Sequence, residues 1–339
     1  MKQPDRCTIK DVAKSAGVSV STVSRVINNN LNVSSEKRRK VLAEIKNSGF
    51  TPNALARGLV QQENRTVCVV LPDIENSFYP SVLRGIENVA QSNDYSVMLY
   101  VMGRKNSNIH QLLQKMYAQQ ASGLIFVAVN IPSGQIPRAM KSLEIVSIQA
   151  DIDIDNVCRV DSTNEKGTRE IVEHLIKLGH KKIAFIGYKL RSLRCIAERY
   201  KGYESALKSH GIDIHSDYIV ECDEFDDPGY ECVQKLLRLK CPPTAIHCIN
   251  EKVAVGAYEA LLEHNLTVPE DISLTANDNS TIAKVLTPKG LTTIAQPAFE
   301  MGVAAAEQLI RNIKSPSPIP CEEIVLGTTL VFRGSTRRI

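Results

Sequence analysis

The stretch TIKDVAKSAGVSVSTVSRVINNN, residues 8–30, decides how the chain begins to fold. Four of its apolar residues recur at intervals of three or four, which predicts one buried helix face: Ile9, Val12, Ala13 and Ala16. Thr8 and Asp11 are spaced as a capping box at the start of that helix, and Gly17 suits its C-terminal cap. We therefore expect a short amphipathic helix that ends in a tight glycine turn.

The residues that follow predict two more helices. Ser19 is placed to cap the second helix, whose inward residues should be Val23, Val26 and Ile27. The segment SSEKRRKVLAEIKNSGF predicts the third helix, which should end at Gly49 and turn inward Val41, Leu42 and Ile45. Three short helices with a tight turn between the first two form a helix-turn-helix unit.

The second helix keeps small and polar residues on its outer face. Arg25 can reach O6 and N7 of one guanine, and the small residues around Val20 let the helix approach base edges. Thr22 and Ser24 suit phosphate oxygens. The predicted DNA-binding residues of this head are Ser19, Val20, Ser21, Thr22, Ser24, Arg25 and Asn28. The alternative is a solvated helix face on a small bundle.

Charge separates this head from the rest of the chain. The 339 residues carry a net charge of +4. Residues 1–65 contain 12 Lys and Arg against 5 Asp and Glu, a net charge of +7, whereas residues 66–339 contain 29 against 32, a net charge of −3. A compact basic head indicates a polyanionic partner, and the helix-turn-helix pattern favours DNA over RNA or a membrane surface.

The segment PNALARGLVQQ, residues 52–62, starts like a helix but contains Gly58 and runs into polar residues. A helix of about two turns is marginal in water, and an interior glycine costs about 1 kcal/mol relative to alanine. This segment is therefore either a plain linker or a helix that forms only when a partner offsets its ordering cost.

The segments TIKDVAKSAGVSVSTVSRVINN and PNALARGL closely resemble the head and hinge of the lactose-repressor/galactose-repressor family of bacterial transcription regulators. The resemblance continues through VCVVLPDIENSFYPSVLRGIENVA, HLIKLGHKKIAFIG, AERYKGYESAL, VPEDISL and LTTIAQP. It implies a hinge that becomes helical on operator DNA, where Leu59 wedges between base pairs of the minor groove and Ala56 is a further contact. Gly58 replaces a serine that is frequent in the family, which predicts a hinge that orders less readily.

From residue 66 onward, predicted strands and helices alternate. The strands include VCVVLP, YSVMLYV and GLIFVAV, and the alternation resumes after Asp161 with KIAFIG and AIHCIN. Two such α/β units predict parallel sheets covered by helices, and the resemblance implies a two-lobed, periplasmic-binding-protein-like body. The expected bounds are a head at 1–51, a hinge helix and linker at 52–65, and an effector-binding and dimerisation domain at 66–339, with an N-lobe at about 66–162 and 292–320 and a C-lobe at about 163–291 and 321–339.

Ligands of parallel sheets bind beyond the carboxyl ends of the strands, so the residues just after each predicted strand are candidates. Amide, guanidinium and carboxylate groups beside an aromatic face suit vicinal hydroxyls or ring nitrogens. The predicted effector-binding residues are Asn76, Phe78, Tyr79, Gln149, Arg199, Asn250, Asp278 and Gln296. The resemblance implies this role for four of them: Arg199, Asn250, Asp278 and Gln296. An Asp or Asn after a strand can instead be only a turn or a helix cap.

These groups predict a sugar or sugar phosphate as the effector, with a purine or nucleoside as the alternative. Two departures from the resembled family lie beside the predicted site. TANDN replaces the Gly–aromatic pair that usually precedes Asp278, and Glu251 stands where an aspartate is common. Both changes alter the wall of the predicted pocket.

Motifs of other protein classes are absent from the sequence. We find no GxGxxG, GxxxxGK[ST], GxSxG or HExxH, and the nine cysteines have no CxxC spacing. We therefore expect a non-enzyme with reduced cysteines, no cofactor and no metal site. The start MKQPDRCTIKD lacks the apolar core of a signal peptide and no run approaches membrane-spanning length, which predicts a cytoplasmic location.

Reading a two-fold operator requires two heads, so we expect a homodimer. The chain stops at LVFRGSTRRI without the leucine heptads of tetrameric relatives, which favours a dimer over a tetramer. The sequence thus predicts a repressor that binds a pseudo-palindromic operator under the control of a small effector. The alternative is a cytosolic sugar- or nucleoside-binding module without operator function.

Overall fold

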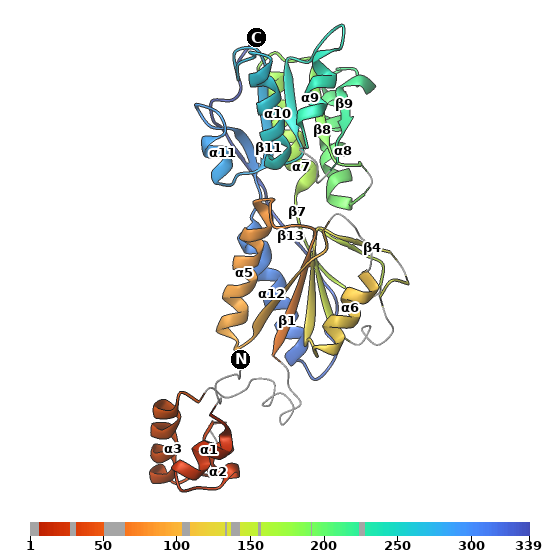
Figure 1. The fold of residues 1–339 in the computed structure, drawn as a ribbon. Helices are drawn as coiled ribbons and strands as arrows, with labels where there is room; N and C mark the ends of the chain where they lie inside the picture. The colour runs from red at the N-terminus through yellow and green to blue at the C-terminus, as the bar shows by residue number, and fades with distance from the viewer. Residues whose placement is uncertain are drawn as a thin grey trace. The chain divides into compact units, whose positions relative to one another are not determined.

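The computed structural model describes residues 7–27, 32–50, 65–103, 109–132, 134–136, 143–154, 157–190, 192–223 and 228–339. The chain divides into two compact units, Met1–Asn64 and Arg65–Ile339. In the described part of the first unit, which we call the head, the helices are α1 (Ile9–Ser15), α2 (Val20–Ile27) and α3 (Ser35–Ser48) (Figure 1).

Local signals in the sequence fix the ends of the head helices. The Thr8 backbone N–H donates to Asp11 Oδ2 at 2.8 Å, which together with the Thr8 side chain completes the predicted capping box. Gly17 and Gly49 have φ values of +65° and +63°, a left-handed conformation that glycine adopts without strain, and they follow α1 and α3. The Thr22 N–H donates to Ser19 Oγ at 3.2 Å, as expected for a cap of α2.

The head buries a small apolar core made of Val12, Ala13, Val23, Val26 and Val41. The prediction that Leu42 points inward was wrong, because this side chain is 51% exposed. The inward stripe of α3 passes through Val41 and Ile45, which are one helical turn apart. Leu42 follows Val41 directly and therefore lies about 100° further around the helix.

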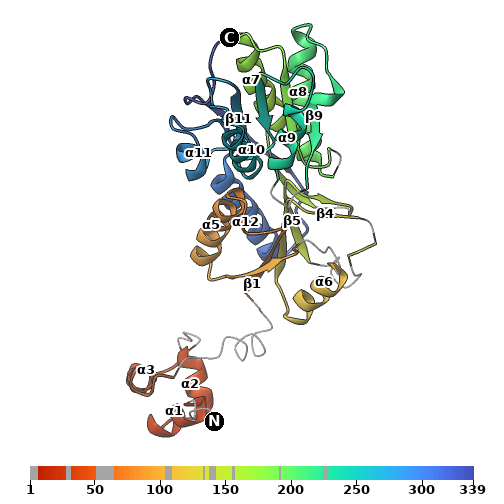
Figure 2. The same cartoon turned by 45° about the horizontal axis from the view of Figure 1, so that its top comes forward.

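The second unit contains two lobes, each built on one six-stranded sheet (Figures 1 and 2). The N-lobe sheet is entirely parallel, with strand order β13-β7-β5-β3-β1-β2. Its strands are β1 (Thr66–Leu71), β2 (Ser96–Val101), β3 (Gly123–Val127), β5 (Glu144–Ile148), β7 (Cys158–Ser162) and β13 (Glu323–Leu326). A separate two-stranded sheet joins β4 (Asn130–Ile131) and β6 (Asp151–Ile152).

Helices α5 (Phe78–Ser92) and α12 (Ala298–Lys314) pack side by side on one face of the N-lobe sheet. Helix α6 (Ile109–Ala118) packs on the other face. A Cβ atom on Gly85 would lie 2.1 Å from the Phe299 carbonyl oxygen, so a glycine is required where α5 and α12 touch. This packing fixes the start of α5, which borders the pocket described below.

The C-lobe sheet has the order β14-β12-β11-β10-β8-β9, and only β14 is antiparallel to its neighbour. Its strands are β8 (Ile183–Gly187), β9 (Ile219–Glu221), β10 (Ala245–Cys248), β11 (Ser273–Asp278), β12 (Thr292–Ala295) and β14 (Thr329–Val331). Its helices are α7 (Asn164–Lys177), α8 (Arg194–Ser209), η2 (Ser216–Tyr218), α9 (Tyr230–Leu237), α10 (Glu251–Glu263) and α11 (Thr281–Val285). Helix α7 packs on α8, and α9 packs on α10.

The chain crosses between the lobes three times: after β7, after β12 and after β13. The predicted lobe bounds were therefore wrong in their C-terminal part. Residues 292–295 form β12, which pairs with β11 in the C-lobe, and residues 323–326 form β13, which pairs with β7 in the N-lobe. The second and third crossings each fall one strand later than expected. The reason is that strand pairing, and not local sequence pattern, assigns a strand to its sheet.

No helix within the described ranges is long and apolar enough to cross a membrane.

Candidate functional site

The outer face of α2 carries the predicted DNA-binding residues that the structure describes. Val20 is 41% exposed, and Arg25 is exposed as well. Ser19 and Ser21 are exposed, whereas Thr22 and Ser24 are half-buried. Three other predicted contacts lie outside the described residues: Asn28, Ala56 and Leu59. An exposed face with an arginine, hydroxyls and a small apolar residue has the chemistry of a helix that reads a DNA groove.

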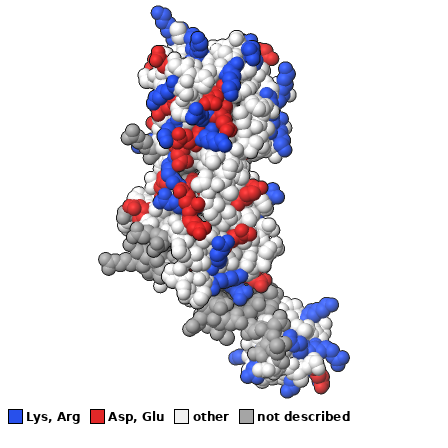
Figure 3. Space-filling model, turned by 180° about the vertical axis from the view of Figure 1, so that it is seen from behind, with Lys and Arg blue, Asp and Glu red and all other residues white. Residues whose placement is uncertain are grey.

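A hollow beside α2 adds two basic residues that sequence reasoning missed. It is lined by Ala13, Lys14, Gly17, Val18, Ser19, Thr22 and Lys37. Ser19 Oγ lies 2.9 Å from Thr22 Oγ1, so a pair of neighbouring hydroxyls lines the hollow together with the two lysines. On the face of the head seen in Figure 3, almost all of the described charged side chains are Lys or Arg. Lysines and hydroxyls on the flank of the recognition helix are suited to DNA phosphates.

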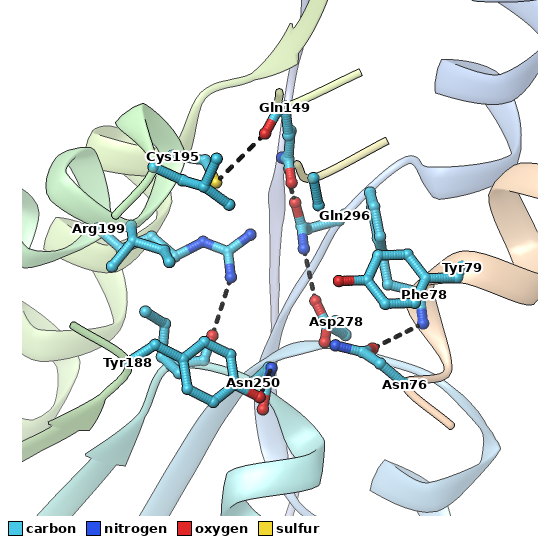
Figure 4. A pocket seen from close by; sticks show the side chains of 14 residues that line it. Asn76, Phe78, Tyr79, Gln149, Tyr188, Cys195, Arg199, Asn250, Asp278 and Gln296 are labelled. Atoms are coloured by element: carbon cyan, nitrogen blue, oxygen red, sulfur yellow. Dashed lines mark hydrogen bonds between the residues drawn. The ribbon is translucent and has the colours of Figure 1, made fainter. Parts of the chain in front are cut away.

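In the body, one pocket brings together all eight predicted effector-binding residues (Figure 4). The lining residues are Asn76, Phe78, Tyr79, Ala128, Gln149, Tyr188, Leu193, Cys195, Ile196, Arg199, Ile249, Asn250, Asp278 and Gln296. The space between these side chains, the open mouth included, is about 420 Å³. Pockets for small ligands have about 300–1,000 Å³, so this one suits a small metabolite.

Both lobes contribute to the pocket through the carboxyl ends of their strands. From the N-lobe, residues 76–79 follow β1, Ala128 follows β3 and Gln149 follows β5. From the C-lobe, Tyr188 follows β8, residues 249–250 follow β10, and residue 278 ends β11. The pocket therefore occupies the position where ligands of parallel sheets bind.

A chain of polar side chains runs along one wall of the pocket (Figure 4). Gln149 Nε2 donates to Gln296 Oε1 at 2.7 Å, and Gln296 Nε2 donates to Asp278 Oδ1. Ser162 Oγ joins this chain by accepting from Gln149 Nε2 at 2.9 Å. The chain orients Gln149 and Gln296, because each amide already has a partner on the protein side.

Asp278 is the most unusual residue of the pocket. Its φ of +113° is a conformation that side-chain-bearing residues rarely adopt. Its Oδ2 atom is buried and accepts no hydrogen bond from any described residue. Burial raises the pKa of the carboxyl, and the nearby Arg199 opposes that shift. A strained backbone and an unsatisfied acceptor in a pocket together mark a place where a ligand hydroxyl can donate.

Arg199 is held by the protein so that its guanidinium points into the pocket (Figure 4). Only 6% of the residue is exposed. Its Nε donates to Asn164 Oδ1 at 3.0 Å, and its Nη1 donates to the Ile249 carbonyl oxygen at 2.9 Å. A planar guanidinium fixed in this way can offer a forked pair of donors to a ligand.

The two asparagines of the pocket also serve the local backbone. Asn250 Oδ1 accepts from the Val253 N–H at 3.0 Å and caps α10, while its Nδ2 donates to the Tyr188 hydroxyl at 2.9 Å. Asn76 Oδ1 accepts from the Phe78 N–H at 3.0 Å. Each of these asparagines therefore bonds the local backbone and also lines the pocket, so the two interpretations do not exclude each other.

Several pocket residues were missed by sequence reasoning, although two signals pointed to them. Tyr188 directly follows the strand KIAFIG, so the rule that found Asn250 also applies to it. Cys195 and Ile196 precede Arg199 on α8 by four and three residues, which places all three on one helix face.

His247 lies behind the pocket on β10 and is completely buried. Its Nδ1 lies 3.1 Å from Thr275 Oγ1. Burial, together with the positive charge of Arg199, lowers the pKa of His247 to about 3, so the ring is neutral. Across the part of the chain that the structure describes, no three His, Cys, Asp or Glu side chains are grouped so as to hold a metal ion.

Comparison with known proteins bears on both sites. Residues 8–53 match the model of the bacterial regulatory proteins of the lacI family, and residues 172–336 match a periplasmic binding protein-like domain. Catabolite control protein A of Priestia megaterium is 35% identical over 97% of this chain and 99% of its own length.

Two solved structures are similar over nearly the whole chain. The lac repressor dimer bound to operator and the anti-inducer ONPF has a TM-score of 0.84 and 27% identity, covering 98% of this chain and 100% of that one. The transcriptional regulator CelR in complex with cellobiose has a TM-score of 0.73 and 27% identity, covering 97% and 100%. With a helix-turn-helix head and a two-lobed body that both match over most of their length, the chain belongs to the lacI family of bacterial regulatory proteins.

Proposed function

We propose that this chain is a transcriptional repressor that binds a pseudo-palindromic DNA operator as a homodimer and is controlled by a sugar or sugar phosphate. The observation that carries the proposal is the pocket in which Arg199 and Asp278 meet Gln296 and Asn250. Family membership supports the DNA-binding part, since the similar lac repressor was solved as a dimer on its operator. Because its target is DNA, the protein acts in the cytoplasm.

The chemistry of the pocket supports a polyhydroxylated effector. Asp278 Oδ2 is an acceptor without a partner among the described residues, and Arg199 supplies oriented donors. Phe78 and Tyr79 pack edge to face with ring centroids 5.8 Å apart and offer an apolar surface to one face of a sugar ring. The similar regulator CelR was solved with a sugar, cellobiose. A purine or nucleoside is the alternative effector, since amides and an aromatic ring also suit ring nitrogens.

The proposed mechanism is a shift between two arrangements of the lobes. An effector that contacts both lobes favours one arrangement by its differential affinity, which typically amounts to about 1–3 kcal/mol of coupling. In a dimer, that arrangement sets the separation of the two segments at residues 52–65. This separation decides whether Ala56 and Leu59 of these segments can insert into the minor groove. Both residues lie outside the described residues.

Operator binding is tested by selecting sites from randomised duplexes and measuring mobility shifts over a salt series. We expect a two-fold symmetric site and an affinity that falls steeply with salt, because the basic head displaces counterions from phosphates. A binding module without operator function would select no consensus and give no retarded band.

Effector binding is tested by thermal-shift screening of pentoses, hexoses, disaccharides, their phosphates and nucleosides. A ligand that binds the native state raises the melting temperature. Asp278→Asn should abolish the shift caused by the best compound but retain operator binding, because it removes only the acceptor charge. Asp217→Asn, an exposed site on η2, is the matched control and should respond like the wild type. An unchanged titration of Asp278→Asn would remove Asp278 from the effector site.

A further inference from the structure

Glu251 is a buried carboxylate that contacts both lobes. It is the first residue of α10, and none of its surface is exposed. Its Oε1 accepts from the Ser280 N–H at 2.7 Å, and its Oε2 accepts from the Ser280 hydroxyl, both within the C-lobe. The same Oε2 accepts from Ser77 Oγ of the N-lobe at 3.2 Å. A buried carboxylate is tolerated only when it is hydrogen-bonded, so its contacts hold these segments together.

The contact with Ser77 serves the lobe interface and not the helix to which Ser77 belongs. Ser77 stands at the N-cap position of α5, but its side chain makes no capping hydrogen bond. The Phe78 N–H at the start of that helix is bonded instead by Asn76 Oδ1. The Ser77 hydroxyl is therefore left to bridge the lobes.

A second contact across the lobes lies next to the first. Lys252 Nζ forms an ion pair with Glu75 Oε2 at 2.8 Å, and the Lys252 side chain is only 17% exposed. We call the four residues Glu75, Ser77, Glu251 and Lys252 the clasp. Exposed ion pairs contribute little by themselves, so the buried carboxylate is the specific part of the clasp.

Ser77 and Glu251 of the clasp are direct sequence neighbours of residues that line the pocket. Ser77 lies between Asn76 and Phe78, and Glu251 follows Asn250, and these three neighbours all line the pocket. Asp278 also lines the pocket and is two residues before Ser280. Closing the clasp therefore sets the N-lobe residues 76 and 78 against the C-lobe residues 250 and 278.

We propose that Glu251 is a positioning residue of the pocket, which joins the 75–78 segment of the N-lobe to α10 and α11 of the C-lobe before any effector binds. This inference names a regulatory element of the site, and its link to repression rests on the proposed function. The closed arrangement is held by the protein itself. An effector then acts by strengthening or opening an existing contact and does not need to draw separate lobes together.

The test is hydrogen–deuterium exchange of the full chain without sugar and without DNA. Ser77→Ala removes only the partner in the N-lobe, whereas Glu251→Ala removes the contacts to both lobes. Because a hydrogen bond to a charged group stabilises by more than a neutral one, we expect amides at residues 76–82 to exchange at least about tenfold faster in both variants. Amides at residues 278–285 should exchange faster in Glu251→Ala alone.

Ser92→Ala is the matched control, since this serine lies at the other end of α5 and its hydroxyl donates to the Asn88 carbonyl oxygen of its own helix. It should exchange like the wild type at residues 76–82. If Ser77→Ala also exchanges like the wild type there, Glu251 merely caps α11 and the proposal fails. Should Glu251→Ala not fold, Ser77→Ala still decides, because it deletes one hydroxyl from a half-buried residue.

The experiment is independent of the proposed function. Because no ligand is present, a negative exchange result would contradict the role of the clasp but not the proposal of effector binding. A failed sugar screen on the wild type would contradict the sugar effector but not the role of the clasp.

Discussion

Asp278 shows how a single residue is kept in a costly state. A positive φ in a residue with a side chain costs about 1–3 kcal/mol, and a buried acceptor without a donor costs a similar amount. Gln296 and Arg199 offset part of this cost through a hydrogen bond and an opposite charge. On the proposed function, a ligand hydroxyl that donates to Oδ2 removes the cost of the unpaired acceptor, whereas the cost of the backbone conformation remains.

Asp161 is a second buried carboxylate, placed where β7 leads into the C-lobe. Arg194 of α8 pairs with its Oδ2 and also with Glu323 Oε1 at 2.8 Å, while Asp161 Oδ1 accepts no hydrogen bond from a described residue. Burial raises the pKa of Asp161 to about 6; Arg194 opposes the shift, and Glu198 and Glu323 add to it. The folded protein therefore holds a proton on Asp161 more tightly than the unfolded chain does.

The sign of the pH effect follows from linkage. Between the ordinary pKa of 3.8 and the raised value of about 6, the folded state binds more protons at Asp161 than the unfolded state. Asp161 should therefore increase the free energy of unfolding as pH falls through this window. Urea unfolding of wild type and Asp161→Asn over a pH series measures this, because the variant lacks the titrating group. Two curves that stay parallel across the window would contradict the prediction.

At the residue scale, the position rule for parallel sheets located those polar pocket residues that stand at or just after a strand end, whereas Arg199 lies within α8 and was indicated by the family resemblance. Asn250 and Asp278 each stand at the end of a strand, so local pattern located them. Part of the apolar lining was not recovered in that way. Ile249 and Leu193 resemble ordinary core residues, and only the approach of the second lobe makes them pocket walls.

At the element scale, the head helices offer two kinds of DNA-facing residue, one on α2 and one on its neighbours α1 and α3. Arg25 stands exposed on the outer face of α2, whereas Lys14 and Lys37 belong to α1 and α3 and flank the helix. Residues on the recognition helix reach base edges, and residues on its flanks reach phosphates. On the proposed function, contacts to base edges and contacts to phosphates should therefore be separable by mutation.

We expect Arg25→Ala to relax base preference at one position of each half-site, because its bidentate contact to a guanine is worth about 1–3 kcal/mol of discrimination. Lys14→Ala should instead weaken binding to all sequences alike and lower the salt dependence by about one ion per head. Binding-site selection and salt titrations on the selected duplex measure both variants. If Lys14→Ala altered the consensus, the assignment of the flank to phosphates would be wrong.

The element scale also shows where sequence pattern stops. The boundaries of α1 and α3 followed from Thr8, Gly17 and Gly49, because capping depends on residues close in sequence. The lobe that receives β12 or β13 depends on which strand edge is free to pair, which no local pattern encodes.

At the scale of the whole molecule, the C-lobe carries exposed apolar side chains on α10 and α11. Leu262 of α10 is 51% exposed and Val285 of α11 is 73% exposed. On the N-lobe, Leu99 and Val101 of the edge strand β2 are 41% and 45% exposed. Exposed apolar side chains of this kind suit contact with another protein, and the proposed homodimer supplies one.

We therefore expect Leu262→Glu to raise the dimer dissociation constant by at least about tenfold, because a charge would lose its water in an apolar interface. Operator affinity should fall with it at low protein concentration, since a monomer engages one half-site only. Sedimentation velocity over a dilution series, followed by mobility shifts at matched concentrations, measures both effects. Val325→Asp is the control, because Val325 is 52% exposed on β13 at the opposite edge of the N-lobe sheet from β2. If Leu262→Glu stayed dimeric while Val325→Asp dissociated, the dimer interface would instead lie at the β13 edge of the N-lobe sheet.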